Sequence, residues 1–119
     1  MAHTLSAYYD TPHGKACAIL LPTVMAYNAD YTGEKYRDIA IAMGVKGVEK
    51  MTQSEYRKAA VDAVRQLSED VGIPTSLKGI VKEEDIPELS KSAYADACRP
   101  GNPRETSVKD IEELYRSLL

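Results

Sequence analysis

Residues 10–22 of the 119-residue chain read Asp10-Thr11-Pro12-His13-Gly14-Lys15-Ala16-Cys17-Ala18-Ile19-Leu20-Leu21-Pro22. Thr11 is a favourable N-cap residue. Pro12 fits the first helical position, because its missing N–H would have no partner there. The apolar run continues to Met25, and a helix that is apolar on nearly every side is typical of a protein interior. We therefore expect a buried helix from about Pro12 to Asn28, with His13 in its first turn.

The remaining sequence predicts more helices and no strand. Apolar stripes with caps and glycine or proline stops indicate helices over about residues 34–43, 52–71, 85–98 and 106–118, with a short helical turn near residues 75–80. The expected stripes include Leu67 and Val71 in the second of these helices and Ala97 in the third, while Ser107 and Asp110 form a capping-box pattern. We expect an all-α fold, a single domain over residues 1–119 built as a bundle of five to seven helices.

Composition excludes several classes of function. Hydrophobic residues are 44%, charged residues 28% and the net charge is −3, so no basic surface for nucleic acid is expected. No apolar run approaches a membrane span, and no signal peptide is visible. Cys17 and Cys98 are far apart in the sequence and fall in helical patterns. We expect them to be buried free thiols of a cytoplasmic protein.

His3 and His13 are the only histidines. Taken by chemistry alone, a single histidine near a helix start is more often a hydrogen-bonded structural residue than a ligand. The two match no compact metal motif and supply too few ligands for a catalytic metal. His3 lies ten positions upstream of His13, too far along the chain for contact between them to be assumed. No G-x-G-x-x-G motif occurs, so no cofactor-binding residue is predicted within the chain.

The segments around both histidines resemble the iron-dependent (group III) alcohol dehydrogenases, and look most similar to the branch that contains lactaldehyde reductases and 1,3-propanediol dehydrogenases. The resemblance covers essentially the whole chain. It is carried by residues 1–5 (MAHTL), 11–14 (TPHG), 18–22 (AILLP), 27–28 (YN), 33–36 (GEKY), 72–74 (GIP), 84–89 (EDIPEL) and 101–104 (GNPR). Complete enzymes of this family are more than twice as long. Their N-terminal α/β half binds the nicotinamide cofactor, and their helical half binds a divalent metal through one Asp and three His.

The resemblance implies a role for three residues. His13 falls on the last metal-ligand histidine, and His3 falls on a catalytic histidine beside the nicotinamide and substrate that is thought to relay a proton. Cys98 falls where a residue lines the substrate pocket, although a small residue buried near a helix end is the commoner role for such a cysteine. Asp10 is not expected to be a ligand, because family members often carry Asn there. Arg104 is expected to cap helix-terminal carbonyls or to pair with Glu105 or Asp110.

The function implied by the resemblance is that of the C-terminal, metal-binding part of an iron-dependent NAD(P) alcohol dehydrogenase. Such an enzyme interconverts small primary alcohols or diols and aldehydes, with Fe²⁺ or alternatively Zn²⁺ as the metal. Because the remaining ligands and the nucleotide-binding half would lie ahead of Met1, we expect this chain to bind neither cofactor tightly and to be inactive alone. Two alternatives stay open: a free-standing helical interaction module that has lost catalysis, and one half of a split dehydrogenase. A homo-oligomer also stays open.

Overall fold

The computed structural model describes all 119 residues and contains six α-helices, four short 3-10 helices and no strand. The α-helices are α1 (Ala2–Tyr9), α2 (His13–Asn28), α3 (Lys35–Ala42), α4 (Gln53–Asp70), α5 (Ile86–Tyr94) and α6 (Val108–Arg116). The 3-10 helices are η1 (Ala29–Tyr31), η2 (Val48–Lys50), η3 (Glu83–Asp85) and η4 (Arg99–Gly101). The all-α prediction and the expected number of helices are therefore confirmed.

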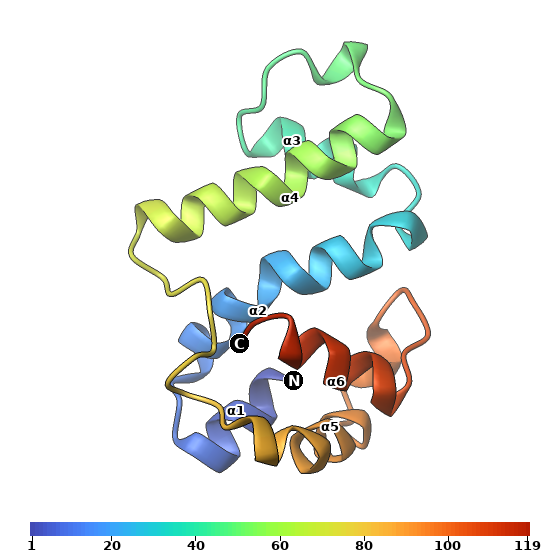
Figure 1. Ribbon diagram of the computed structural model, residues 1–119. Coiled ribbons are helices and arrows are strands. Elements are labelled where there is room, and N and C mark those ends of the chain that lie inside the picture. The colour runs from blue at the N-terminus through green and yellow to red at the C-terminus, as the bar shows by residue number, and fades with distance from the viewer.

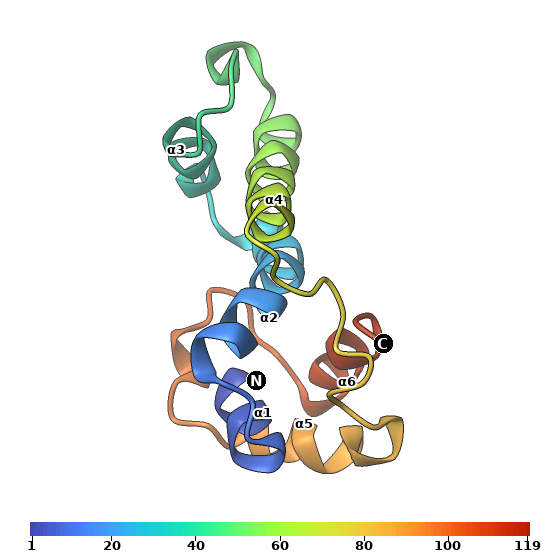
Figure 2. The same ribbon diagram turned by 90° about the vertical axis from the view of Figure 1, so that its left-hand side faces the viewer.

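Helix α2 runs between two groups of helices (Figure 1), with α1, α5 and α6 on one side and α3 and α4 on the other. Ile19 and Leu20 belong to a buried apolar cluster of 12 residues with α1, α5 and α6. Met25, one turn further along, belongs to a second cluster of 7 residues with α3 and α4. The helices α3 and α4 pack side by side (Figure 2). The two clusters are thus joined through a single helix.

The start and the burial of α2 differ from the sequence expectation. Pro12, with an extended backbone, is the N-cap residue and makes no side-chain cap, so α2 begins at His13 and Thr11 lies before the cap. The helix is not buried all round, since Cys17 and Leu21 are exposed, Leu21 by 48%. An apolar sequence does not distinguish a helix face that is buried in a core from one that lines an open pocket. Cys17 and Leu21 lie on a face that lines a pocket.

Helix α1 was not predicted from the sequence. It has eight residues and no side-chain N-cap bond, and it ends at Asp10, whose left-handed φ of 52° suits Asp or Asn. Contacts from distant segments hold it. Leu5 is fully buried, the Tyr115 hydroxyl donates to the Met1 carbonyl oxygen at 3.0 Å, and the Tyr9 hydroxyl donates to Asp85 at 2.6 Å. Tertiary packing therefore stabilises α1 where local signals are weak.

Three smaller expectations were wrong. Leu67 and Val71 are 50% and 65% exposed, because α4 extends beyond the helices that cover its first turns. Ala97 is exposed, since α5 ends at Tyr94. Residues 75–80 form a turn with one isolated bridge instead of a helical turn, although Leu77 within it is fully buried. No helix of the chain is long and apolar enough to span a membrane.

The predicted capping box at the start of α6 is present. The Asp110 backbone N–H donates to Ser107 Oγ at 3.1 Å, and the Ser107 backbone N–H donates to Asp110 Oδ2 at 2.8 Å. The bond from the Ser107 hydroxyl, followed by that from its backbone N–H, holds the pKa of the Asp110 carboxyl below its usual value. The capping box therefore favours the ionised carboxylate.

We predict that Asp110→Asn lowers the free energy of unfolding by about 0.5–1 kcal/mol at pH 7. The native pKa of Asp110 is lowered, so its contribution is present above the unfolded pKa of about 3.9 and is lost as pH falls through the native pKa. Urea unfolding followed by circular dichroism at pH 7 and pH 3 should show the difference shrinking. Glu113→Gln, in the same helix, serves as the control. A deficit that is equal at both pH values would contradict this account.

Candidate functional site

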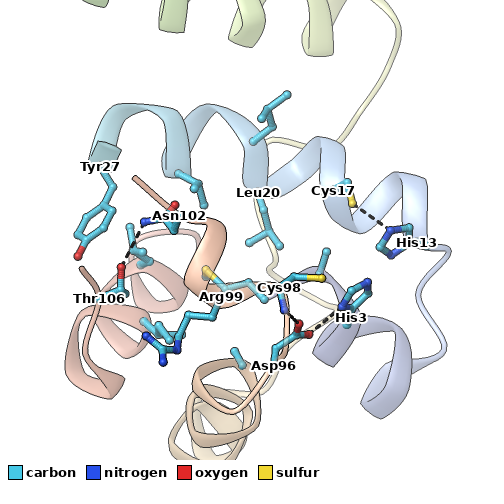
Figure 3. A pocket seen from close by; sticks show the side chains of 17 residues that line it. His3, His13, Cys17, Leu20, Tyr27, Asp96, Cys98, Arg99, Asn102 and Thr106 are labelled. Carbon is cyan, nitrogen blue, oxygen red and sulfur yellow. Dashed lines mark hydrogen bonds and ion pairs between the residues drawn. The ribbon is translucent and has the colours of Figure 1, made fainter. Parts of the chain in front are cut away.

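An open pocket with a volume of about 430 Å³ lies along the exposed side of α2 (Figure 3). Residues of α1, α2, the end of α5, the 95–106 loop and α6 line it, and 11 of the 17 lining residues are hydrophobic. Leu20, Leu21 and Val24 of α2 form much of the apolar wall. Size and apolar character match those of pockets for small ligands. Most of its polar lining groups gather at two ends.

His3 and His13 meet at one end of the pocket. Their rings stack with centroids 5.1 Å apart and an interplanar angle of 16°. The separation of ten positions along the chain had given no reason to assume contact between the two histidines, but the structure brings their rings together. Asp10, in the left-handed conformation, ends α1 and turns the chain into α2, and α1 packs against α2 so that the two rings meet. Asp10 itself does not line the pocket.

Asp96 was not identified from the sequence, although it contacts His3. Its Oδ2 lies 2.7 Å from His3 Nδ1, and its Oδ1 accepts a hydrogen bond from the Cys98 backbone N–H at 2.8 Å. The Cys98 bond, followed by the His3 bond, holds the pKa of the Asp96 carboxyl below its usual value. Potential ligand atoms of His3, Asp96 and Cys98 lie within 4.8 Å of one another. The only sequence signal was an aspartate two residues before Cys98, a spacing typical of turns.

Cys17 and Cys98 both line this pocket and are free but exposed, so their predicted burial was wrong. Cys17 stands one helical turn after His13, and its Sγ lies 3.5 Å from His13 Nε2. Cys98 follows the end of α5 and therefore lies in a loop and not inside a helix. The thiols and both imidazoles share one end of the pocket (Figure 3).

The other end of the pocket is held by the loop before α6. The side-chain amides of Asn28 and Asn102 exchange two hydrogen bonds of 2.7 and 2.9 Å. Arg104 donates to the Tyr27 carbonyl oxygen at 2.9 Å, and its guanidinium lies 3.9 Å from the centre of the Tyr27 ring. The predicted capping of helix-terminal carbonyls by Arg104 is confirmed, whereas the alternative ion pair with Glu105 or Asp110 does not form. These contacts fix the loop against the end of α2.

The arrangement combines an apolar wall with two imidazoles in different settings. His3 has a carboxylate partner, as expected of an imidazole that accepts or delivers a proton. His13 is exposed and has no carboxylate partner, so a ring nitrogen is available to a ligand. The chain offers no glycine-rich phosphate loop beside them. The geometry therefore fits proton transfer and metal binding at this end of the pocket.

Comparisons with known proteins place the chain among dehydrogenases. The family model described as "Fe-containing alcohol dehydrogenase family, C-terminal" matches residues 1–119. The chain is 60% identical to lactaldehyde reductase of Escherichia coli over 98% of its length, and 40% identical to 1,3-propanediol dehydrogenase of Citrobacter freundii, also over 98%. It superposes on a crystal structure of 1,3-propanediol oxidoreductase with a TM-score of 0.94 and 37% identity over 99% of the chain. It spans only 31%, 30% and 31% of these proteins, respectively.

We predict that both thiols react rapidly with a thiol reagent such as dithionitrobenzoate in the folded chain, because both are exposed at the pocket. Two equivalents should react without denaturant. Cys17→Ser and Cys98→Ser should each remove one equivalent. A thiol that reacts only after denaturation would contradict the described pocket.

Proposed function

Because this chain belongs to the Fe-containing alcohol dehydrogenase family, we propose that it forms the helical side of the active site of an enzyme that uses NAD(P) to interconvert small primary alcohols or diols and aldehydes. The observation that carries the proposal is the meeting of His3 and His13 at one end of an apolar pocket. The names of the two relatives, a lactaldehyde reductase and a 1,3-propanediol dehydrogenase, support this substrate class.

His13 is proposed as a metal ligand. It is exposed at the pocket and has no acidic partner, so its neutral imidazole suits Fe²⁺ or alternatively Zn²⁺. One imidazole is too few for a catalytic metal, and the other ligands would come from outside these 119 residues. A divalent ion bound there would polarise the substrate oxygen and lower the pKa of the hydroxyl.

His3 is proposed as the residue that carries the hydroxyl proton away. Oxidation of an alcohol by a nicotinamide transfers a hydride and leaves that proton to be removed. The His3 ring is 57% exposed and faces the pocket, so one edge can receive a proton and pass it to water. Cys98, on the same rim, would contact the substrate, and the wall formed by Leu20 and Leu21 would hold its carbon chain and exclude water.

A nucleotide-binding half is the partner that this proposal requires. Its docking on the open side of the pocket would cover Leu21, which is 48% exposed in this chain. This exposed apolar wall favours a site completed by another domain over a free-standing interaction module. Residues 1–119 would then act as one helical domain, in the cytoplasm, where exposed thiols such as Cys17 stay reduced.

The chain on its own should bind Fe²⁺ or Zn²⁺ only weakly, because His13 is the single proposed ligand within it. Equilibrium dialysis followed by elemental analysis should find no stoichiometric metal after treatment with a chelator. His13→Ala should leave this result unchanged. A full equivalent of metal that resists the chelator would contradict the incomplete ligand set.

We predict that the chain restores activity when it replaces the matching C-terminal segment of E. coli lactaldehyde reductase, to which it is 60% identical. The iron-loaded chimera should oxidise 1,2- or 1,3-propanediol with NAD(P), followed as NAD(P)H absorbance. The isolated chain should show no turnover, because alcohol, metal and nicotinamide are not held together; the loss of positioning alone forfeits about 7–11 kcal/mol.

His13→Ala in the chimera should lower kcat more than the roughly 10- to 100-fold typical of residues that only support a metal ligand. Glu69→Ala, an exposed position on α4, serves as the matched control and should leave activity unchanged. A folded, iron-loaded chimera without activity, or activity that survives His13→Ala, would overturn the proposed function.

A further inference from the structure

We propose that Asp96 is a positioning residue that fixes the tautomer and the orientation of His3 for proton transfer. This inference rests on the proposed function, because it concerns how His3 does its work. It assigns a role to a residue that neither the sequence motif nor the family resemblance indicated. Three contacts carry it: Asp96 with His3, Asp96 with the Cys98 backbone, and His3 with His13.

The hydrogen bond between Asp96 and His3 sets the tautomer. An ionised carboxylate only accepts hydrogen bonds, so the 2.7 Å contact with Asp96 Oδ2 requires the proton of a neutral His3 ring to sit on Nδ1. Nε2 of that ring is then left with its lone pair. A carboxylate that accepts from one ring nitrogen commonly fixes the tautomer of a histidine in this way. The atom that receives the substrate proton is thus Nε2.

Asp96 is itself fixed and charged. Its side chain is only 16% exposed, and its other oxygen accepts the Cys98 backbone N–H at 2.8 Å. That bond and the one from His3 favour the ionised form and hold the pKa of the carboxyl below its usual value. The His3 side chain, by contrast, is 57% exposed. The carboxylate is therefore anchored on the protein side, and the imidazole extends from it into the pocket.

The stacked His13 ring supplies a second restraint on His3. The rings lie almost parallel, 16° apart, so His13 covers one face of His3 while Asp96 holds one edge (Figure 3). A face contact alone allows the ring to flip, which places Cδ2 where Nδ1 was and Cε1 where Nε2 was. The edge contact with Asp96 excludes the flip, since only Nδ1 lies within hydrogen-bond distance of the carboxylate.

His3, Asp96 and Cys98 also resemble a small metal site, because one potential ligand atom of each lies within 4.8 Å of the others. Both oxygens of Asp96 already accept a hydrogen bond from a donor. The Cys98 backbone, and not its thiol, makes the contact with Asp96. An ion bound through His3 Nδ1 would replace the hydrogen bond between His3 and Asp96, so the observed geometry favours positioning over metal binding.

The tautomer can be measured directly on the 119-residue chain by two-bond ¹H–¹⁵N correlation spectra of its two histidines, in the presence of a chelator. At a pH where His3 is neutral, we expect the Nδ1–H form of His3 to dominate. Asp96→Ala should return His3 to the mixed tautomers of a free imidazole. Asp62→Ala, an exposed carboxylate on α4, should change nothing, and circular dichroism checks that each variant is folded. An unchanged His3 spectrum in folded Asp96→Ala would overturn the inference.

The chimera with E. coli lactaldehyde reductase gives the second readout. Asp96→Ala should lower kcat by about 10- to 100-fold while KM stays within about twofold, because proton transfer and not substrate binding depends on it. Asp96→Asn keeps the shape of the side chain but not its charge, so its kcat should lie between those of the parent chimera and of Asp96→Ala.

The two readouts separate the two proposals. If the parent chimera is inactive, the proposed function is refuted. If the His3 tautomer nevertheless depends on Asp96, the proposal that Asp96 fixes the tautomer of His3 is supported. An active chimera whose kcat is unchanged by Asp96→Ala would refute the positioning role alone. Zinc bound stoichiometrically by His3, Asp96 and Cys98 would also refute it.

Discussion

The rest of the structure depends on the burial of α2 in two separate clusters. Ile19 and Leu20 pack with α1, α5 and α6, and Met25 packs with α3 and α4. Neither cluster is large, so the helix that joins them sets their relative placement. Because α2 is held along its length, its first turn presents His13 at one end of the pocket, and its last residues receive the 102–106 loop at the other.

Local signals in the sequence predicted the elements that rest on local physics. The capping box of α6 joins residues three apart in the chain, and it occurs as predicted. Thr52 caps α4 in a similar local way, by accepting a hydrogen bond from the Glu55 backbone N–H. Helix α1 was missed, because its stability comes from contacts such as that between Tyr115 and Met1, which are far apart in the chain. The burial of α2 was overestimated because the spacing of apolar residues along a helix does not reveal which apolar face stays open to a ligand or a partner.

The candidate site, like the fold, was only partly predictable from the sequence. Family resemblance indicated His3, His13 and Cys98, and the structure brings all three to one pocket. Their arrangement could not be derived from spacing, since it depends on the turn at Asp10 that stacks the two imidazoles. Asp96 lies 93 positions from His3 and belongs to no motif, so only the folded chain reveals the pair. The proposed site residues are thus partly predictable from the sequence, whereas the residues that contact and orient them are not.

We propose that His13 is a metal ligand in a site that other residues complete, and that Asp96 holds His3 in place next to it. The most direct test is a crystal structure of the iron-loaded chimera with anomalous data collected at the iron edge. The account predicts one iron peak about 2.0–2.2 Å from a ring nitrogen of His13, with no His3 nitrogen at that distance and the His3–Asp96 hydrogen bond intact. An iron peak bound by His3, Asp96 and Cys98, or one away from His13, would contradict it.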